Sequence, residues 1–98
     1  MKLRTFVRPE AQTDIRKAAR WYEDRESGLG MRFLREIRTT LLHISANPLM
    51  FPIVEGDARR ALLHKFPYSI YFLNEHETAR IIAVLHQHRR PDAWKYRR

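Results

Sequence analysis

The hydrophobic residues of this chain recur with two different periods, which separates helical from extended segments. Between Pro9 and Glu26, and again between Met31 and Ala46, apolar residues recur every three or four positions, the spacing of one face of a helix. The predicted buried positions are Ala11, Ile15, Ala18, Ala19 and Tyr22 in the first segment and Phe33, Leu34, Ile37, Leu41 and Ile44 in the second. Only the glycine-containing segment 27–30 separates the two, so we predict an antiparallel helical hairpin.

The remaining segments have the composition and alternation of β-strands. Leu3–Val7 alternates loosely and precedes Pro9, a residue suited to the first position of a helix, so we predict a strand here, at the edge of a sheet. Three further strands are predicted over Ala58–Lys65, Ser69–Leu73 and Ala79–His86. The last contains the continuous run Ile81–Leu85, which is typical of a strand buried on both faces. Short connections make consecutive strands antiparallel.

Segment 49–57 lies between the helices and these strands, and it is predicted as a loop because Pro52 and Gly56 interrupt it. Met50, Phe51 and Ile53 are predicted to fill the core from this loop. The resulting order is β–α–α–β–β–β. It indicates an α+β fold, with the helical hairpin packed on one face of a small, mostly antiparallel sheet. We expect residues 1–98 to form a single domain, because a chain of this length builds one core.

Composition adds a bias towards an anionic partner. The 98 residues contain 19 Lys and Arg against 11 Asp and Glu, with a net charge of +8 and a pI near 10.6. This balance favours nucleic acid, the ribosome or an acidic protein as partner, although excess charge also keeps a small protein soluble. The lack of cysteine excludes disulfides, thiol catalysis and cysteine-ligated metals. Without a signal-peptide pattern or a long apolar run, we expect a cytoplasmic protein with no membrane partner.

Positive charge concentrates at the ends of the predicted strands and in the C-terminal segment. From His86 onward, five Lys or Arg residues accompany a single Asp. We predict a basic rim that binds phosphate or carboxylate groups; solvated strand ends without a ligand are the alternative. The predicted partner-binding residues are Arg59, Arg60, His88, Arg89, Arg90, Trp94 and Arg97. Trp94 is also a candidate for folding back onto the core and holding the C-terminal segment down.

His86 and His88 are candidates for chemistry, because alternate residues of a strand share a face. Together they could ligate a metal ion, but no other histidine has a spacing that supplies a third ligand, so we predict no metal site. A general acid or base beside Arg89 is a second interpretation. A histidine that is hydrogen-bonded at the end of a strand is the third.

Other polar and aromatic residues are interpreted more simply. Trp21 and Tyr22 are predicted to pack against the core. The acidic residues Glu23, Asp24 and Glu26 are predicted to form a solvated helix face. The chain has no phosphate-binding glycine loop and no helix-turn-helix pattern, so we do not expect sequence-specific reading of DNA.

Several short motifs in a fixed order resemble those of one protein family. The segments WYED, GLG, NPLMFP, RRALLHKFPYSIYF and IIAVLHQHRRPDAW follow one another between Ala11 and Arg97. Their order, and the β–α–α–β–β–β succession, are similar to the RelE/ParE toxin superfamily in its ParE-like, plasmid-stabilisation branch. The resemblance implies a toxin of a type II toxin–antitoxin system, without a cofactor. It also implies a cognate acidic antitoxin that holds the toxin inactive and folds in part on binding.

The resemblance implies one of two targets. ParE-like members inhibit DNA gyrase and have no known active site; the helical hairpin and the HQHRRPDAW segment favour this function. RelE-like members are ribosome-dependent endoribonucleases that cut mRNA in the ribosomal A site. For this alternative, the loose counterparts of the RelE-type residues are Arg59, Arg60, Lys65, His86, Arg89 and Tyr96. A toxin-like module that has lost its activity and only binds a partner is a third interpretation.

Overall fold

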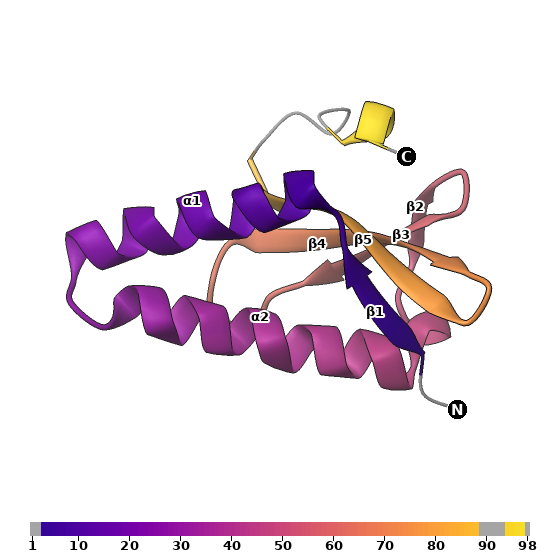
Figure 1. The fold of residues 1–98 in the computed structure, drawn as a ribbon, viewed down its shortest axis with the longest axis horizontal. Helices are drawn as coiled ribbons and strands as arrows, with labels where there is room; N and C mark the ends of the chain where they lie inside the picture. The colour runs from indigo at the N-terminus through magenta and orange to yellow at the C-terminus, as the bar shows by residue number, and fades with distance from the viewer. Residues whose placement is uncertain (1–2, 89–93, 98) are drawn as a thin grey trace.

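The computed structural model describes residues 3–88 and 94–97 and confirms an α+β fold. Its elements are strand β1 (Arg4–Val7), helices α1 (Pro9–Arg25) and α2 (Leu29–Ala46), and strands β2 (Ile53–Glu55), β3 (Ala58–Leu62), β4 (Tyr68–Glu75) and β5 (Thr78–His86). Short 3-10 turns span Pro48–Met50 and Lys95–Arg97. Figure 1 shows the two helices side by side, with their connection at the end of the molecule opposite the β4–β5 hairpin.

The strands form one sheet in the order β1-β5-β4-β3-β2. All neighbours are antiparallel except β1 and β5, which are parallel. The N-terminal strand therefore lies at a sheet edge, as predicted, and β5 lies between β1 and β4. The pairing of β1 with β5 ends at Val7 and Ile81. The second half of β5 consequently extends beyond its neighbour on that side.

The tip of the helical hairpin is organised by Glu23. Its carboxylate accepts hydrogen bonds from the backbone N–H groups of Gly28 and Gly30, both at 3.0 Å, so it caps the first turn of α2. Because of this cap, α2 begins at Leu29, two residues earlier than predicted. Gly30 also permits close packing of the helices, since a Cβ atom there would lie 2.7 Å from the carbonyl oxygen of Ala19.

Both faces of the sheet are buried, each by a different part of the chain. The core under the helices contains the buried residues Ala11, Ala18, Phe33, Ile37, Ile44, Ala61, Leu63, Ile70, Phe72, Ala79, Ile81 and Val84. The core on the other face contains Ala58, Leu73, Ile82, Ala83, Leu85 and Trp94. β5 contributes residues to both cores through a β-bulge at Ile82. Ile81 and Ala83 pair with consecutive residues of β4, and Ile82 between them has no partner there. The prediction that this strand is buried on both faces is confirmed.

The predicted loop 49–57 is wrong in two respects. It contains strand β2, which pairs with β3 at the edge of the sheet. Met50 and Ile53 are exposed, and only Phe51 of the three predicted residues packs against the core. Leu34 also departs from the predicted stripe, because it lies at the outer side of the helix pair and is 38% exposed.

The boundaries of β3, β4 and β5 differ from the predicted ones. A turn centred on His76 and Glu77, which both have positive φ, replaces the predicted five-residue loop. Such two-residue turns match the twist of the strands that they join, so β4 and β5 are longer than predicted. β3 is shorter, since it ends at Leu62 rather than Lys65.

Candidate functional site

An apolar groove lies between α1 and the adjoining ends of β4 and β5. Its volume is about 700 Å³. The residues that line it are Asp14, Lys17, Ala18, Trp21, Tyr22, Pro67, Tyr68, Val84, Leu85 and His86. We refer to it as the α1–β5 groove. Since α1 projects beyond the sheet at this end (Figure 1), side chains of the helix wall are open to solvent.

Trp21 is the most prominent side chain of the α1–β5 groove. Its neighbour Tyr22 packs as predicted, within 4.9 Å of Phe66 and 5.4 Å of Phe33 between ring centres. Burial raises the pKa of the Tyr22 hydroxyl above its usual value, so this group stays neutral. Trp21 itself is 50% exposed, which corrects the prediction that it packs in the core. The guanidinium of Arg25 lies over its ring, 3.9 Å from the centroid, and makes a cation–π contact with the indole.

Asp14 forms a hydrogen bond to the edge of β5 at the floor of the groove. The backbone N–H of Val84 lies beyond the end of β1 and donates to the Asp14 carboxylate at 3.0 Å. The same carboxylate accepts hydrogen bonds from Arg97 of the C-terminal turn, at 2.5 and 3.4 Å. The sequence interpretation missed this role. The available signal was the position of Asp14 three residues after Ala11 and four before Ala18, at the flank of the buried stripe.

His86 lies at the rim of the same groove, at the end of β5. Its ring meets Tyr68 edge-on at 5.2 Å, and its Nδ1 atom accepts the backbone N–H of His88 at 3.1 Å. This is the hydrogen-bonded strand end that the third interpretation predicted. In residues 3–88 and 94–97, no group of three His, Cys, Asp or Glu side chains is arranged to hold a metal ion.

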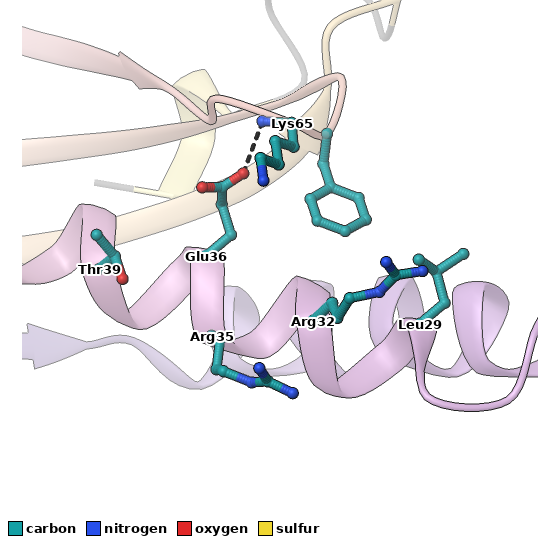
Figure 2. Close-up of a pocket in the computed structure, with 7 residues that line it drawn as sticks. Leu29, Arg32, Arg35, Glu36, Thr39 and Lys65 are labelled. Atoms are coloured by element: carbon teal, nitrogen blue, oxygen red, sulfur yellow. Dashed lines mark hydrogen bonds between the residues drawn. The ribbon is translucent and has the colours of Figure 1, made fainter.

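A second pocket, of about 400 Å³, lies between α2 and the loop after β3. Figure 2 shows Glu36 reaching from α2 to the backbone of Lys65, whose N–H donates to the carboxylate at 2.6 Å. Arg35 points away from this contact (Figure 2). Arg32 lines the pocket and forms an ion pair with Glu26 at 3.0 Å. Glu36 therefore ties the loop to the helix.

A third pocket, on the sheet face opposite the helices, holds Arg60 between the sheet and the C-terminal segment. Trp94 stacks on Tyr71 there at 4.9 Å and is only 3% exposed. The prediction that Trp94 folds back onto the core is confirmed. The same burial removes Trp94 from any surface that a partner could contact. Lys95 secures the segment further through an ion pair with Glu55 at 3.1 Å.

The residues proposed for ribonuclease chemistry are distributed over different parts of the surface. Lys65, His86 and Arg60 each line a different one of the three pockets described above. Arg59 donates to the carbonyl oxygen of Phe51 at 2.6 Å. Tyr96 projects into solvent and is 95% exposed.

The predicted basic rim is only partly described. Arg89 and Arg90 lie outside the described residues. Arg97 is engaged with Asp14 and also donates to the carbonyl oxygen of Ile82 at 3.4 Å, so it has a structural role. His88 is exposed and stays a candidate contact residue.

The fold and the sequence are similar to those of known toxins. A solved chain from the chromosomal ParDE toxin–antitoxin system of P. aeruginosa superposes with a TM-score of 0.75 over 87% of this chain and 96% of its own, at 13% sequence identity. At this identity the likeness concerns the fold. The sequence itself matches the model of a family described as the ParE toxin of the type II toxin–antitoxin system parDE, over residues 6–91. The chain belongs to this family of type II toxins.

No curated protein sequence matches the chain. Within the described residues, neither helix is long and apolar enough to cross a membrane.

Proposed function

We propose that this toxin inhibits DNA gyrase by binding, in the cytoplasm, and that its cognate antitoxin neutralises it by occupying the α1–β5 groove. The proposed antitoxin site rests on one observation: Trp21 is half-exposed above the apolar floor of the groove. Aromatic anchors that are open in the free protein and buried in a complex supply much of the affinity of protein interfaces. The gyrase target rests on the ParE-like motifs. It is supported by the positions of Arg60 and His86, which disfavour their acting on one phosphate: Arg60 lies on the sheet face opposite the helices, whereas His86 lines the groove on the α1 side.

The groove suits an amphipathic segment of the antitoxin. Its walls are mainly apolar, and its rim has the cation Lys17 and the imidazole of His86. A segment with one apolar face and acidic flanks would cover Trp21 and pair with this rim. Contacts at the rim are exposed, so the affinity should decrease moderately with ionic strength.

Trp21→Ala should weaken antitoxin binding by roughly 30-fold, because the variant removes the aromatic anchor of the groove. Titration calorimetry of the purified toxin with its antitoxin measures this change. Leu42→Ala is the matched control: Leu42 is also 50% exposed, but it lies on α2, outside the groove. Equal losses in the two variants, or no loss in either, would place the antitoxin elsewhere.

The gyrase proposal is tested with purified toxin in supercoiling and gyrase-mediated DNA cleavage assays. We expect inhibition of supercoiling, relieved by stoichiometric antitoxin. Relaxation of the same DNA by a type I topoisomerase serves as the control for simple coating of the DNA by a basic protein, and it should be unaffected. Unchanged gyrase activity at toxin concentrations that stop growth would contradict the proposal. Cleavage of A-site mRNA on translating ribosomes, lost in His86→Ala or Arg89→Ala, would replace it with the endoribonuclease alternative.

A further inference from the structure

The outer face of the helical hairpin, turned away from the sheet, has a groove that the α1–β5 site does not include. Arg16, Lys17 and Arg20 of α1 border it, and its volume is about 510 Å³. The other residues that line it are Thr13, Ala19 and Leu34. Within residues 3–88 and 94–97, no carboxylate belongs to this lining. The groove therefore presents three cations and a hydroxyl group around a small apolar floor.

These three cations have no acidic partner in the described part of the chain, unlike five other cations. Arg8, Arg32, Arg80, Lys95 and Arg97 each form an ion pair with a carboxylate. Within residues 3–88 and 94–97, no carboxylate lies within 4.0 Å of the charged groups of Arg16, Lys17 or Arg20. Arg16 has a single hydrogen bond, to the Thr13 hydroxyl at 3.2 Å. Within the described residues, these three cations therefore form no ion pair.

α2 continues the same charged face. The helices are antiparallel and in close contact where Gly30 meets Ala19, and Leu34 lies in the groove one turn later. Arg38 follows one further turn along α2, at the level of the first half of α1, and Arg35 is exposed beside it. Both lack a carboxylate within 4.0 Å in the described part of the chain. Figure 1 shows α1 and α2 lying alongside each other over this length.

We propose that this hairpin face binds the phosphodiester backbone of a nucleic acid, independently of sequence. Four of its five cations are arginines, whose planar guanidinium groups make paired hydrogen bonds to phosphate oxygens. Among the residues that line the groove, Leu34 is the only large apolar side chain, whereas an acidic amphipathic peptide would need a continuous apolar seam. In the part of the chain that the structure describes, no aromatic residue lines the groove to stack on a base. Contacts with the backbone alone carry no sequence information.

This property is separate from the proposed inhibition of gyrase and from antitoxin binding. Lys17 lines both grooves, so variants that test the hairpin face should leave it intact. Arg16 and Arg20 line only the outer groove and are one helical turn apart. The double variant Arg16→Gln, Arg20→Gln removes two charges and retains long polar side chains with good helix propensity.

The control is the double variant Arg4→Gln, Lys95→Gln, which changes the net charge equally but alters β1 and the C-terminal turn. Fluorescence anisotropy of a labelled 24-nucleotide single-stranded RNA and of a labelled duplex DNA of the same length, over a series of salt concentrations, measures binding. We expect Arg16→Gln, Arg20→Gln to weaken binding roughly tenfold and the control to change it by less than about twofold. The slope of log affinity against log salt should become shallower by about 1.8 for duplex DNA and about 1.4 for the single strand.

The probe whose affinity decreases more in Arg16→Gln, Arg20→Gln shows whether the face binds RNA or duplex DNA. Equal losses in the two double variants would mean that binding follows net charge alone, and would overturn the assignment. Displacement of both nucleic acids by poly-glutamate at an equal charge concentration would also overturn it, in favour of an acidic protein partner. Circular dichroism melting of both variants verifies that a loss of binding does not come from unfolding.

Discussion

Asp14→Ala should lower the free energy of unfolding by about 3 kcal/mol, because one carboxylate accepts hydrogen bonds from both the Val84 N–H and the Arg97 guanidinium. The variant leaves the backbone N–H of Val84 unpaired beyond the end of β1, and it leaves the guanidinium of Arg97 without its counter-charge. The C-terminal turn would lose its attachment to α1 at the same time. Urea denaturation of the purified toxin measures the change.

Two companion variants separate these contributions. Asp14→Asn retains an acceptor for the Val84 N–H and loses the charge, so it should cost less than Asp14→Ala. Arg97→Gln removes the cation but retains the Asp14–Val84 hydrogen bond, so its cost should also be smaller. An Asp14→Ala variant as stable as the wild type would show that water replaces the carboxylate at the β5 edge.

Phe33→Ala should cost about 4 kcal/mol, because it removes a fully buried ring from the centre of an aromatic cluster. Phe33 packs within 5.2 Å of Phe66, 5.3 Å of Tyr68 and 5.4 Å of Tyr22, measured between ring centres. This cluster joins both helices to the loop before β4. Its loss should also loosen the sheet-facing wall of the α1–β5 groove. Thermal or urea denaturation tests the loss of stability.

Leu34→Ala is the control for this prediction, since Leu34 is the next residue along α2 and belongs to the same predicted stripe. It is 38% exposed at the outer side of the hairpin, so its truncation should cost only about 1 kcal/mol. A cost comparable to that of Phe33→Ala would contradict the orientation of α2 described here.

The sequence predicted the helices well because their signal is local. The three-and-four spacing of Phe33, Ile37 and Ile44 correctly marks the buried face of α2. The same spacing wrongly predicted Leu34 to be buried. Periodicity identifies an apolar face of a helix, but it does not show which side of that face the neighbouring helix covers. The close approach of the helices at Gly30 decides this. Strand β2 was missed for a related reason, since a three-residue segment becomes a strand only through its pairing with β3.

The candidate site was less predictable than the fold. Trp21 had the appearance of a packing residue, because the sequence does not reveal how far α1 projects beyond the sheet. Asp14 belongs to no recognisable sequence motif. It matters because β5 extends beyond the end of β1, so that the N–H of Val84, seventy positions further along the chain, bonds to the Asp14 carboxylate instead. The interpretation of Trp94 as a residue that returns to the core was correct, since a lone indole after a charged segment has few other apolar surfaces to contact.

By itself, the sequence determined the helical hairpin, the approximate places of most of the strands, the excess of positive charge and the ParE-like order of motifs. These depend on periodicity and on residues that are close along the chain. The tertiary structure alone decided that the ribonuclease candidates Lys65, His86 and Arg60 line different pockets, that an apolar groove opens beside Trp21, and that Arg16 and Arg20 form no ion pair within the described residues. Each of these depends on which distant segments meet when both faces of the sheet are buried.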